Sequence, residues 1–304
     1  MPFCLRLKAV TLHAGKRIWK LALAVTIRRH MKLSDFKNKH VYLVGGSSGI
    51  GLAIAEKLVG AGAHVIIISR TLSTLQTALE TLQIRRMDSG QKIQISNLDV
   101  SDHQLTHSTL NELVNSFGVP DALINCAGRA FPQHHDEISY EQFDQTLKVN
   151  LYGCRNTVAA LIPHMKKNGG LIVNTASLAG IIGVFGMTDY SASKFALIGY
   201  SEALRSEVKK YNIKVMVLCP PDTDTPGFEN ENKTKPAETH AVSESASLLT
   251  SDQVASAFFK ALPKKNMIIV PGAAGKFSVY MKRFFPRVVE FVMDRDVRRV
   301  TTDN

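Results

Sequence analysis

Short apolar runs alternate with longer segments of helical periodicity along most of this chain. The β-branched runs at 63–69, 170–175 and 213–218 predict buried strands, because turn residues bound them and their length fits a strand covered on both faces. Repeated strand–helix alternation predicts a parallel sheet with helices on both faces. The predicted strands are 41–45, 63–69, 93–98, 121–125, 170–175, 213–218 and 267–270, and the predicted helices are 50–58, 71–87, 192–210, 251–262 and one beginning near 140. The pattern therefore predicts a single doubly wound α/β domain over residues 38–272.

Positive charge is concentrated at the two ends of the chain. Of the formal net charge of +11, residues 1–40 carry +9, residues 273–304 carry +3 and the middle carries −1. We therefore divide the chain into a basic arm at 1–37, the domain at 38–272 and a basic segment at 273–304. Because the domain itself is near neutral, we expect no nucleic-acid partner, and the arms favour an anionic membrane surface.

The two arms differ in their apolar pattern. Apolar side chains recur at helical spacing in the C-terminal segment, at Phe277, Met281, Phe284, Val288 and Phe291. Pro286 is expected to interrupt this helix. The segment suits a membrane interface, and it equally suits packing on the domain or on a partner subunit. The run 18–27 is shorter than the ~20 residues of a bilayer span. It fits an interfacial anchor, an organellar transit segment or an extension upstream of Met31.

The cysteines show no spacing typical of a metal site or of a disulfide framework. The four, Cys4, Cys126, Cys154 and Cys219, lack any paired CxxC arrangement. We interpret them as free thiols in a reducing compartment and predict no metal site. With 45% apolar residues, a chain of 304 residues has enough apolar side chains for a full core without such cross-links.

A glycine-rich string, "GGSSGIG" at 45–51, lies where the first strand gives way to the first helix. Backbone without side chains allows close approach of a pyrophosphate, and the free N–H groups of the helix N-terminus bind its charge. The second strand ends at Ser69–Arg70 with no acid to hold a ribose hydroxyl. A guanidinium pairs well with phosphate, so Arg70 predicts NADP rather than NAD.

Candidate catalytic residues lie in "YSASK" at 190–194. Tyr190 and Lys194 are four residues apart and share one helix face. An ammonium group beside the phenol is expected to lower its pKa, and the phenol then donates a proton to a carbonyl oxygen as hydride arrives. Ser177 follows the strand "GLIVNT" and is placed to reach the same carbonyl. Asn150 lies in "KVNLYG" on the helix that begins near 140.

Taken together, these motifs, with "NCAG" at 125–128, resemble the classical short-chain dehydrogenase/reductase family. The resemblance covers nearly all of 38–272 and implies a Rossmann-type sheet of about seven strands, with a homodimer or homotetramer as the assembly. It implies that Tyr190 donates the proton, Ser177 polarises the carbonyl, Lys194 holds the nicotinamide ribose and Asn150 positions a water. It also implies that Asn125 steadies the central sheet. The residues implied for the cofactor are Gly45, Ser47, Ser48, Gly49, Ile50, Gly51, Arg70, Asp99, Asn125, Ala127, Gly128, Tyr190, Lys194, Pro220, Thr223 and Thr225.

The loop after the sixth strand, "PPDTDTPGFENENKTKPAET", resembles that of 3-ketodihydrosphingosine reductases. This implies NADPH-dependent reduction of a long-chain 3-keto sphingoid base on the cytoplasmic side of a membrane, which is the endoplasmic reticulum in a eukaryote and the inner membrane or cytoplasm in a bacterium. Two alternatives stay open. One is a reductase of another lipid ketone, such as a 3-oxoacyl or steroid substrate, and the other is a catalytically silent NADP-binding sensor.

Overall fold

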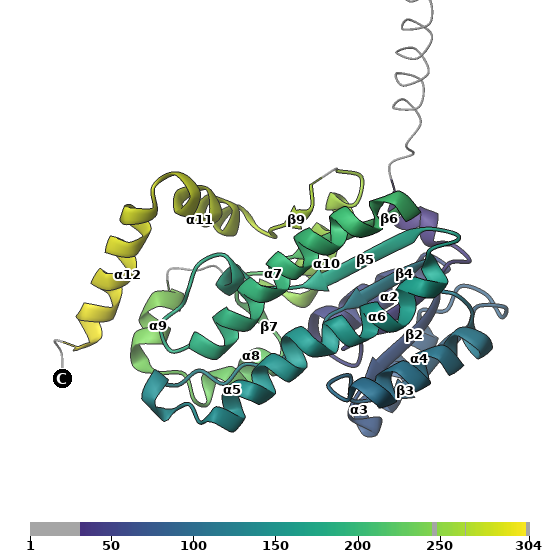
Figure 1. Ribbon diagram of the computed structural model, residues 1–304, viewed down its shortest axis with the longest axis horizontal. Helices are drawn as coiled ribbons and strands as arrows, with labels where there is room; N and C mark the ends of the chain where they lie inside the picture. Colours follow the sequence, from purple (N-terminus) through teal and green to yellow (C-terminus); the bar gives the residue numbers. More distant parts are fainter. Residues whose placement is uncertain (1–30, 245–247, 265, 302–304) are drawn as a thin grey trace, which may run out of the picture. The chain divides into compact units, whose positions relative to one another are not determined.

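A computed structural model describes residues 31–301 except 245–247 and 265 (Figure 1). From Lys32 onward the described residues form one compact unit. Most of the basic N-terminal arm, including the apolar run 18–27, lies outside the described residues. The C-terminal segment predicted as an arm belongs to the same compact unit as the α/β domain, so residue 272 does not separate two folding units.

The centre of the fold is a seven-stranded sheet in the order β3-β2-β1-β4-β5-β6-β9. Every neighbouring pair is parallel, which confirms the predicted doubly wound sheet. The strands are β1 (His40–Val44), β2 (His64–Ser69), β3 (Ile93–Asn97), β4 (Ala122–Asn125), β5 (Gly170–Thr175), β6 (Ile213–Leu218) and β9 (Ile268–Ile269). The inner strands are buried along almost their whole length, as expected for a parallel sheet covered on both faces.

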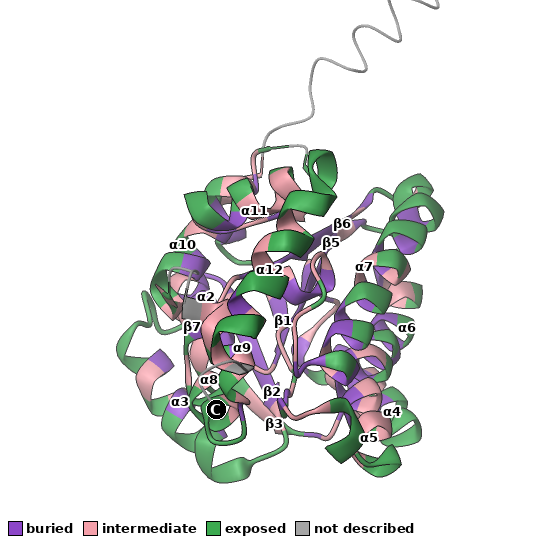
Figure 2. Cartoon of the chain, turned by 90° about the vertical axis from the view of Figure 1, so that its left-hand side faces the viewer, coloured by how far each residue is buried: buried purple, intermediate pink, exposed green. Residues whose placement is uncertain are grey.

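Helices cover the sheet on both faces. Figure 2 shows α2, α3 and α10 on one side and α4, α6 and α7 on the other. The helices that form these two layers are α2 (Gly49–Gly60), α3 (Leu72–Ile84) and α10 (Ser251–Ala261), and α4 (His103–Phe117), α5 (Tyr140–Leu147), α6 (Gly153–Met165) and α7 (Thr188–Val208). The register pairs Val44 with Asn125 and Asn125 with Asn174, so the carboxyl ends of β1, β4 and β5 meet at one edge. Ligands of doubly wound sheets bind at this edge.

The helix that was predicted to begin near 140 is interrupted. It changes at Lys148–Tyr152 into a π-helical turn before α6 begins. Such turns insert a residue into the helix and occur often at functional sites. Asn150 lies in the middle of the turn, which directs its side chain toward the loop after β4.

The segment after β6, which looks like a loop in the sequence, has secondary structure. It contains a short parallel pair, β7 (Thr223–Asp224) with β8 (Leu249–Thr250), and two helices, α8 (Pro226–Asn232) and α9 (Ala237–Glu244). Thr225 caps α8, because its hydroxyl accepts a hydrogen bond from the Phe228 N–H at 3.0 Å. The Thr239 hydroxyl donates to the Phe185 carbonyl at 2.9 Å, which ties α9 to the loop after β5.

The C-terminal segment forms two helices, α11 (Ala273–Phe284) and α12 (Pro286–Thr301). The break at Phe285 and Pro286 confirms the predicted interruption. Figure 1 shows α12 beside α9, and the two helices pack against each other. Gly275 at the start of α11 lies against Leu178, which follows β5. No helix among the described residues combines the length and apolar character needed to cross a bilayer.

Candidate active site

The predicted catalytic hydroxyls meet at the carboxyl edge of the sheet. Ser177 follows β5, and Tyr190 lies in the first turn of α7. The Ser177 hydroxyl forms a hydrogen bond with the Tyr190 phenol. Both side chains line a cavity of about 470 Å³ whose walls also come from α8, α11 and α12. A carbonyl group in this cavity would have two hydroxyl groups within reach.

Lys194 lies one turn after Tyr190 and is buried. Its Nζ donates a hydrogen bond to the Thr175 carbonyl at 2.9 Å and lies 5.5 Å from the centre of the Tyr190 ring. Burial disfavours the charged form and lowers the pKa of Lys194 to about 8. A Cβ on Gly128 would lie 3.3 Å from this Nζ, so the "NCAG" loop and the amine share one wall of the site.

The expectation that Lys194 lowers the pKa of Tyr190 is wrong for this arrangement. Burial raises the pKa of Tyr190, and the nearby Glu231 carboxylate raises it further, while the Ser177 hydrogen bond lowers it only in part. The amine is directed at the Thr175 carbonyl rather than at the phenol oxygen. Tyr190 is therefore held in its neutral form, which is the form that donates a proton to a carbonyl oxygen.

Asn150 connects three segments of the site. Its Oδ1 accepts a hydrogen bond from the Arg129 N–H at 2.8 Å, and its Nδ2 donates to the Arg129 carbonyl at 2.9 Å. The same Nδ2 donates to the Ser193 hydroxyl at 2.9 Å, and that hydroxyl donates to the Tyr190 carbonyl at 2.7 Å. Asn150 thus fixes the loop after β4 against the first turn of α7.

Asp189, which was not predicted from the sequence, fixes the backbone of Tyr190. It is fully buried, and its carboxylate accepts hydrogen bonds from the Tyr190 N–H and from the Thr146 hydroxyl, both at 2.7 Å. A buried carboxylate requires such partners. Its position directly before the tyrosine was a sequence signal, but only the fold shows that Thr146 on α5 is its second partner.

The glycine-rich turn has no space for a side chain at any of its four glycines. A Cβ on Gly45 would come within 2.5 Å of the Ala127 nitrogen, and a Cβ on Gly51 would overlap the Gly45 carbonyl oxygen. Gly49 has a φ of +53° and lies against the Thr225 side chain, so the turn meets the segment after β6. Ser48 precedes α2 without capping it, which leaves the first N–H groups of this helix free of a side-chain acceptor. Ile50 lines the cavity, and the Ser47 hydroxyl donates to Ser69 at 3.0 Å.

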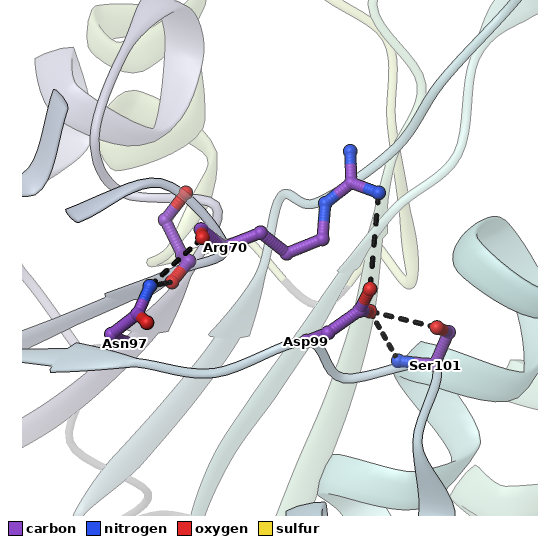
Figure 3. A network of polar contacts seen from close by, with 5 residues as sticks. Arg70, Asn97, Asp99 and Ser101 are labelled. Carbon is purple, nitrogen blue, oxygen red and sulfur yellow. Dashed lines mark hydrogen bonds and ion pairs between the residues drawn. The ribbon is translucent and has the colours of Figure 1, made fainter. Parts of the chain in front are cut away.

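Arg70 and Asp99 lie at the carboxyl ends of β2 and β3 (Figure 3). The Arg70 Nη1 is 3.9 Å from the Asp99 carboxylate, and the Arg70 side chain is 54% exposed. Asp99 is oriented by Ser101, whose N–H and hydroxyl donate to it at 2.9 and 2.7 Å. Asn97 donates to the Arg70 carbonyl at 2.8 Å and so fixes the backbone of this turn. The guanidinium head is free to turn toward a phosphate.

A second guanidinium, Arg129, follows "NCAG" and was not predicted from the sequence. Its Nε is buried and has no hydrogen-bond partner among the described residues. Burial and the nearby charge of Arg70 lower the pKa of Arg129. Two cations that repel each other, one with an orphaned donor, fit an anionic group such as a dinucleotide phosphate.

The remaining predicted cofactor residues have different surroundings. Asn125 is buried inside the sheet, where its Nδ2 donates to Asn174 at 3.0 Å and its Oδ1 accepts from Thr157 at 2.9 Å. Its side chain therefore supports the sheet behind the site. The Pro220 carbonyl accepts from the Leu178 N–H at 3.0 Å, and the Thr223 hydroxyl donates to the Pro221 carbonyl at 2.8 Å. The first bond holds the segment after β6 against the residues that follow β5, and the second is local to that segment.

Comparison with known proteins identifies the family. The model of short chain dehydrogenases matches residues 39–236. The chain belongs to this family. It is 37% identical over 238 residues to the 3-ketodihydrosphingosine reductase of Bos taurus, which covers 78% of this chain and 72% of that protein. It is 40% identical over 223 residues to the 3-dehydrosphinganine reductase of Danio rerio, and the match covers 73% of this chain and 67% of that protein.

Solved structures of other family members share the fold. A short-chain dehydrogenase/reductase from Burkholderia phymatum in complex with NAD superimposes with a TM-score of 0.72 at 23% identity, covering 83% of this chain and 95% of that one. A short-chain dehydrogenase from Burkholderia cenocepacia in complex with NADP gives a TM-score of 0.70 at 20% identity, and the match covers 86% of this chain and 99% of that one. These likenesses support the fold alone.

As a short-chain dehydrogenase/reductase, the protein is an oxidoreductase that uses a nicotinamide dinucleotide. Its residues fit that cofactor by several independent features. The glycine turn leads into α2, whose N-terminus has no side-chain cap, the arginine pair suits an anionic group, and Lys194 lies beside Gly128. The fold brings together the four side chains that the family resemblance implies for catalysis, Asn150, Ser177, Tyr190 and Lys194.

Proposed function

We propose that this enzyme uses NADPH to reduce the ketone of a long-chain 3-keto sphingoid base. The observation that carries the proposal is the cavity at Tyr190 and Ser177. Beyond these hydroxyls its lining is mostly apolar and comes from the loop after β5 and from α8, α9, α11 and α12. The apolar side chains from the C-terminal helices are Phe277, Met281, Val288, Val289, Val292 and Met293. Such a wall suits an alkyl chain attached to a reacting carbonyl.

Each catalytic side chain has a role that follows from its surroundings. When bound, the dinucleotide supplies the hydride. The neutral Tyr190 phenol donates a proton to the carbonyl oxygen, and the Ser177 hydroxyl holds that oxygen by a hydrogen bond. The Lys194 amine donates a hydrogen bond to the Thr175 carbonyl and lies beside Gly128. A ribose hydroxyl of the cofactor would be within its reach there.

The named relatives support the sphingoid substrate, and reduction of a 3-oxoacyl or steroid ketone is the main alternative. The experiment is to incubate the purified full-length protein with NADPH and 3-ketosphinganine and to identify the products by mass spectrometry. Formation of sphinganine with loss of NADPH absorbance supports the proposal. Turnover of a 3-oxoacyl or steroid ketone without turnover of 3-ketosphinganine would replace it, and binding of NADPH without turnover of any ketone would favour a silent sensor.

The choice of NADPH over NADH is proposed to depend on Arg70. Arg70→Ala should raise the KM for NADPH by about 10- to 100-fold, because hydrogen bonds to a charged phosphate contribute about 1.5–3 kcal/mol. The KM for NADH should stay nearly unchanged, since NADH lacks the 2′-phosphate. Steady-state kinetics with both cofactors measures this. An equal loss for both would make Arg70 a structural residue of the turn.

We also propose that the enzyme works on the cytoplasmic side of a membrane, and that α11 and α12 contact anionic lipid. Phe284 and Phe291 are 58% and 67% exposed and lie outside the cavity lining. The exposed cations Lys276, Arg283 and Arg287 lie on the same two helices. Phenylalanine favours the acyl boundary, and each basic residue near an anionic surface contributes about 1 kcal/mol.

The membrane proposal predicts that F284S/F291S weakens binding to anionic liposomes by at least about tenfold, because each phenylalanine loses about 1.5–3 kcal/mol of apolar burial when fully inserted. Flotation at low and high salt measures this. Ile84→Ser is the matched control, since Ile84 on α3 is 85% exposed and lies on another part of the domain. If both variants float like the wild type, the C-terminal helices are not the contact surface, and the basic arm at 1–37 becomes the candidate.

A further inference from the structure

The cavity at Tyr190 has an acidic end. Among the described residues that line it, Asp222 and Glu231 carry the only charged side chains, and both lie in the segment after β6. Glu231 is half-buried near the end of α8 and is close enough to Tyr190 for its charge to raise the pKa of the phenol. A carboxylate therefore faces the position where the reacting carbonyl would bind.

No side-chain contact of Glu231 among the described residues explains why a carboxylate stands in this apolar cavity. Within the described ranges no hydrogen bond or ion pair is formed by its side chain, whereas Asp144, which is also partly exposed, pairs with Lys148 at 2.6 Å. Lys235, the cation whose charge lowers the pKa of Glu231 most, lies with its Nζ over the Phe228 ring at 4.5 Å. Burial without a partner raises the pKa of Glu231 to about 7, because the charged form is poorly solvated.

We propose that Glu231 binds the ammonium group of the substrate and so selects ketones that carry a cationic amine close to the carbonyl. This inference rests on the proposed function, because it takes the carbonyl to be held by Tyr190 and Ser177. A sphingoid ketone has its amine on the carbon beside the carbonyl, which places the positive charge next to the hydroxyl pair. Asp222 lines the same end of the cavity and adds negative potential there.

The same carboxylate discriminates against neutral lipid ketones. A 3-oxoacyl chain or a steroid would cover Glu231 with apolar atoms and leave it desolvated without a counter-charge, which is costly. An ammonium group in this position removes that cost and gains an ion pair in a setting of low polarity. Glu231 therefore favours the amino ketone by attraction and disfavours its competitors by desolvation, the two elements of specific recognition.

The test compares two substrates of equal chain length, 3-ketosphinganine and the corresponding long-chain 3-ketone that lacks the amine. Glu231→Gln should lower kcat/KM for the amino ketone by about 10- to 100-fold, mainly through KM, since the lost bond involves charged groups on both sides. The kcat/KM for the amine-free ketone should stay level or rise. Glu229→Gln is the matched control, because Glu229 is exposed on the same helix and does not line the cavity.

A pH profile gives a second readout that a merely structural role would not produce. The charged or titratable groups that face Glu231 are Asp222, Lys194, Lys235 and Tyr190. Because the pKa of Glu231 is about 7, its carboxylate is lost as the pH falls below that value. The wild-type kcat/KM for the amino ketone should therefore decline below about pH 7, and Glu231→Gln should abolish this acidic limb while NADPH affinity and thermal stability stay unchanged.

The outcomes separate this inference from the proposed function. If the wild type does not reduce 3-ketosphinganine, the proposed function fails. If the wild type reduces it and Glu231→Gln reduces it equally well, or if the variant loses activity equally toward both ketones, the assignment of Glu231 is overturned. Loss of NADPH binding in the variant would likewise overturn it, because the defect would then lie in the fold of the site.

Discussion

Tyr190→Phe is expected to lower kcat for ketone reduction by about 10²–10⁴-fold, the usual contribution of a positioned general acid. The substitution removes only the phenol oxygen. The ring can keep its place, because Asp189 binds the backbone N–H of this residue and Ser193 binds its carbonyl. The affinity for NADPH should change little, since its phosphates are proposed to bind the glycine turn and the arginine pair.

The measurement is single-turnover reduction under saturating NADPH, with cofactor binding followed separately by fluorescence. Tyr200→Phe is the matched control. Tyr200 lies on the same helix, burial also raises its pKa, and it does not line the cavity. Turnover of Tyr190→Phe within a fewfold of the wild type would remove Tyr190 from the mechanism and shift attention to Ser177 as the proton donor.

Gly51→Ala should weaken NADPH binding by about 10- to 100-fold and destabilise the fold by about 1–3 kcal/mol, as overpacking of a well-filled site does. The added Cβ would overlap the Gly45 carbonyl oxygen. The turn must then move, and with it the N–H groups that meet the pyrophosphate. Isothermal titration with NADPH and thermal unfolding measure the two effects.

The same helix provides the control for this glycine. Gly60 ends α2 and has open space around the position of a Cβ. Gly60→Ala should be neutral or stabilise by a few tenths to about 1 kcal/mol, because alanine loses less backbone entropy in a helix. Unchanged NADPH affinity in Gly51→Ala would show that the turn adapts, and the cofactor fit argued from its close packing would then be wrong.

Local patterns were enough to predict much of the fold. Short runs between turn residues predicted all seven strands of the main sheet, and the signal was clearest for β2, β5 and β6, whose apolar side chains are buried on both faces. The glycine turn was correctly placed between the first strand and the first helix, and Ser177 directly after the strand at 170–175, because turn residues mark where such strands end. Pro286 was correctly predicted to break the C-terminal helix, since proline removes a backbone donor wherever it occurs.

Features that depend on contacts between distant segments were not predicted. The π-helical turn at Asn150 is held by Arg129 and Ser193, which lie 21 and 43 residues away in the chain. The short pair of β7 with β8 joins Thr223 to Leu249, and α8 and α9 lie between these strands. The sequence of this segment is polar and rich in turn residues, so its helices depend on caps such as Thr225 and on packing against α12.

The pKa of Tyr190 shows the same limit at the level of chemistry. The spacing to Lys194 correctly placed both side chains on one helix face, but it did not show where the amine points or how deeply the phenol is buried. The amine donates its hydrogen bond to the Thr175 carbonyl, and burial raises the pKa of the phenol. An electrostatic effect depends on distance and on the surrounding medium, and neither can be obtained from spacing along one helix.

The sequence by itself determined the family, the parallel sheet and the position of the glycine-rich turn, because short motifs and the strand–helix alternation are local features of the chain. Only the tertiary structure decided that the C-terminal helices form a wall of the cavity, that Arg129 joins Arg70 at the cofactor site, and that Glu231 faces the catalytic tyrosine. These relations join residues that are far apart in the chain, and they arise because each helix buries its apolar face against whichever surface the rest of the fold leaves uncovered.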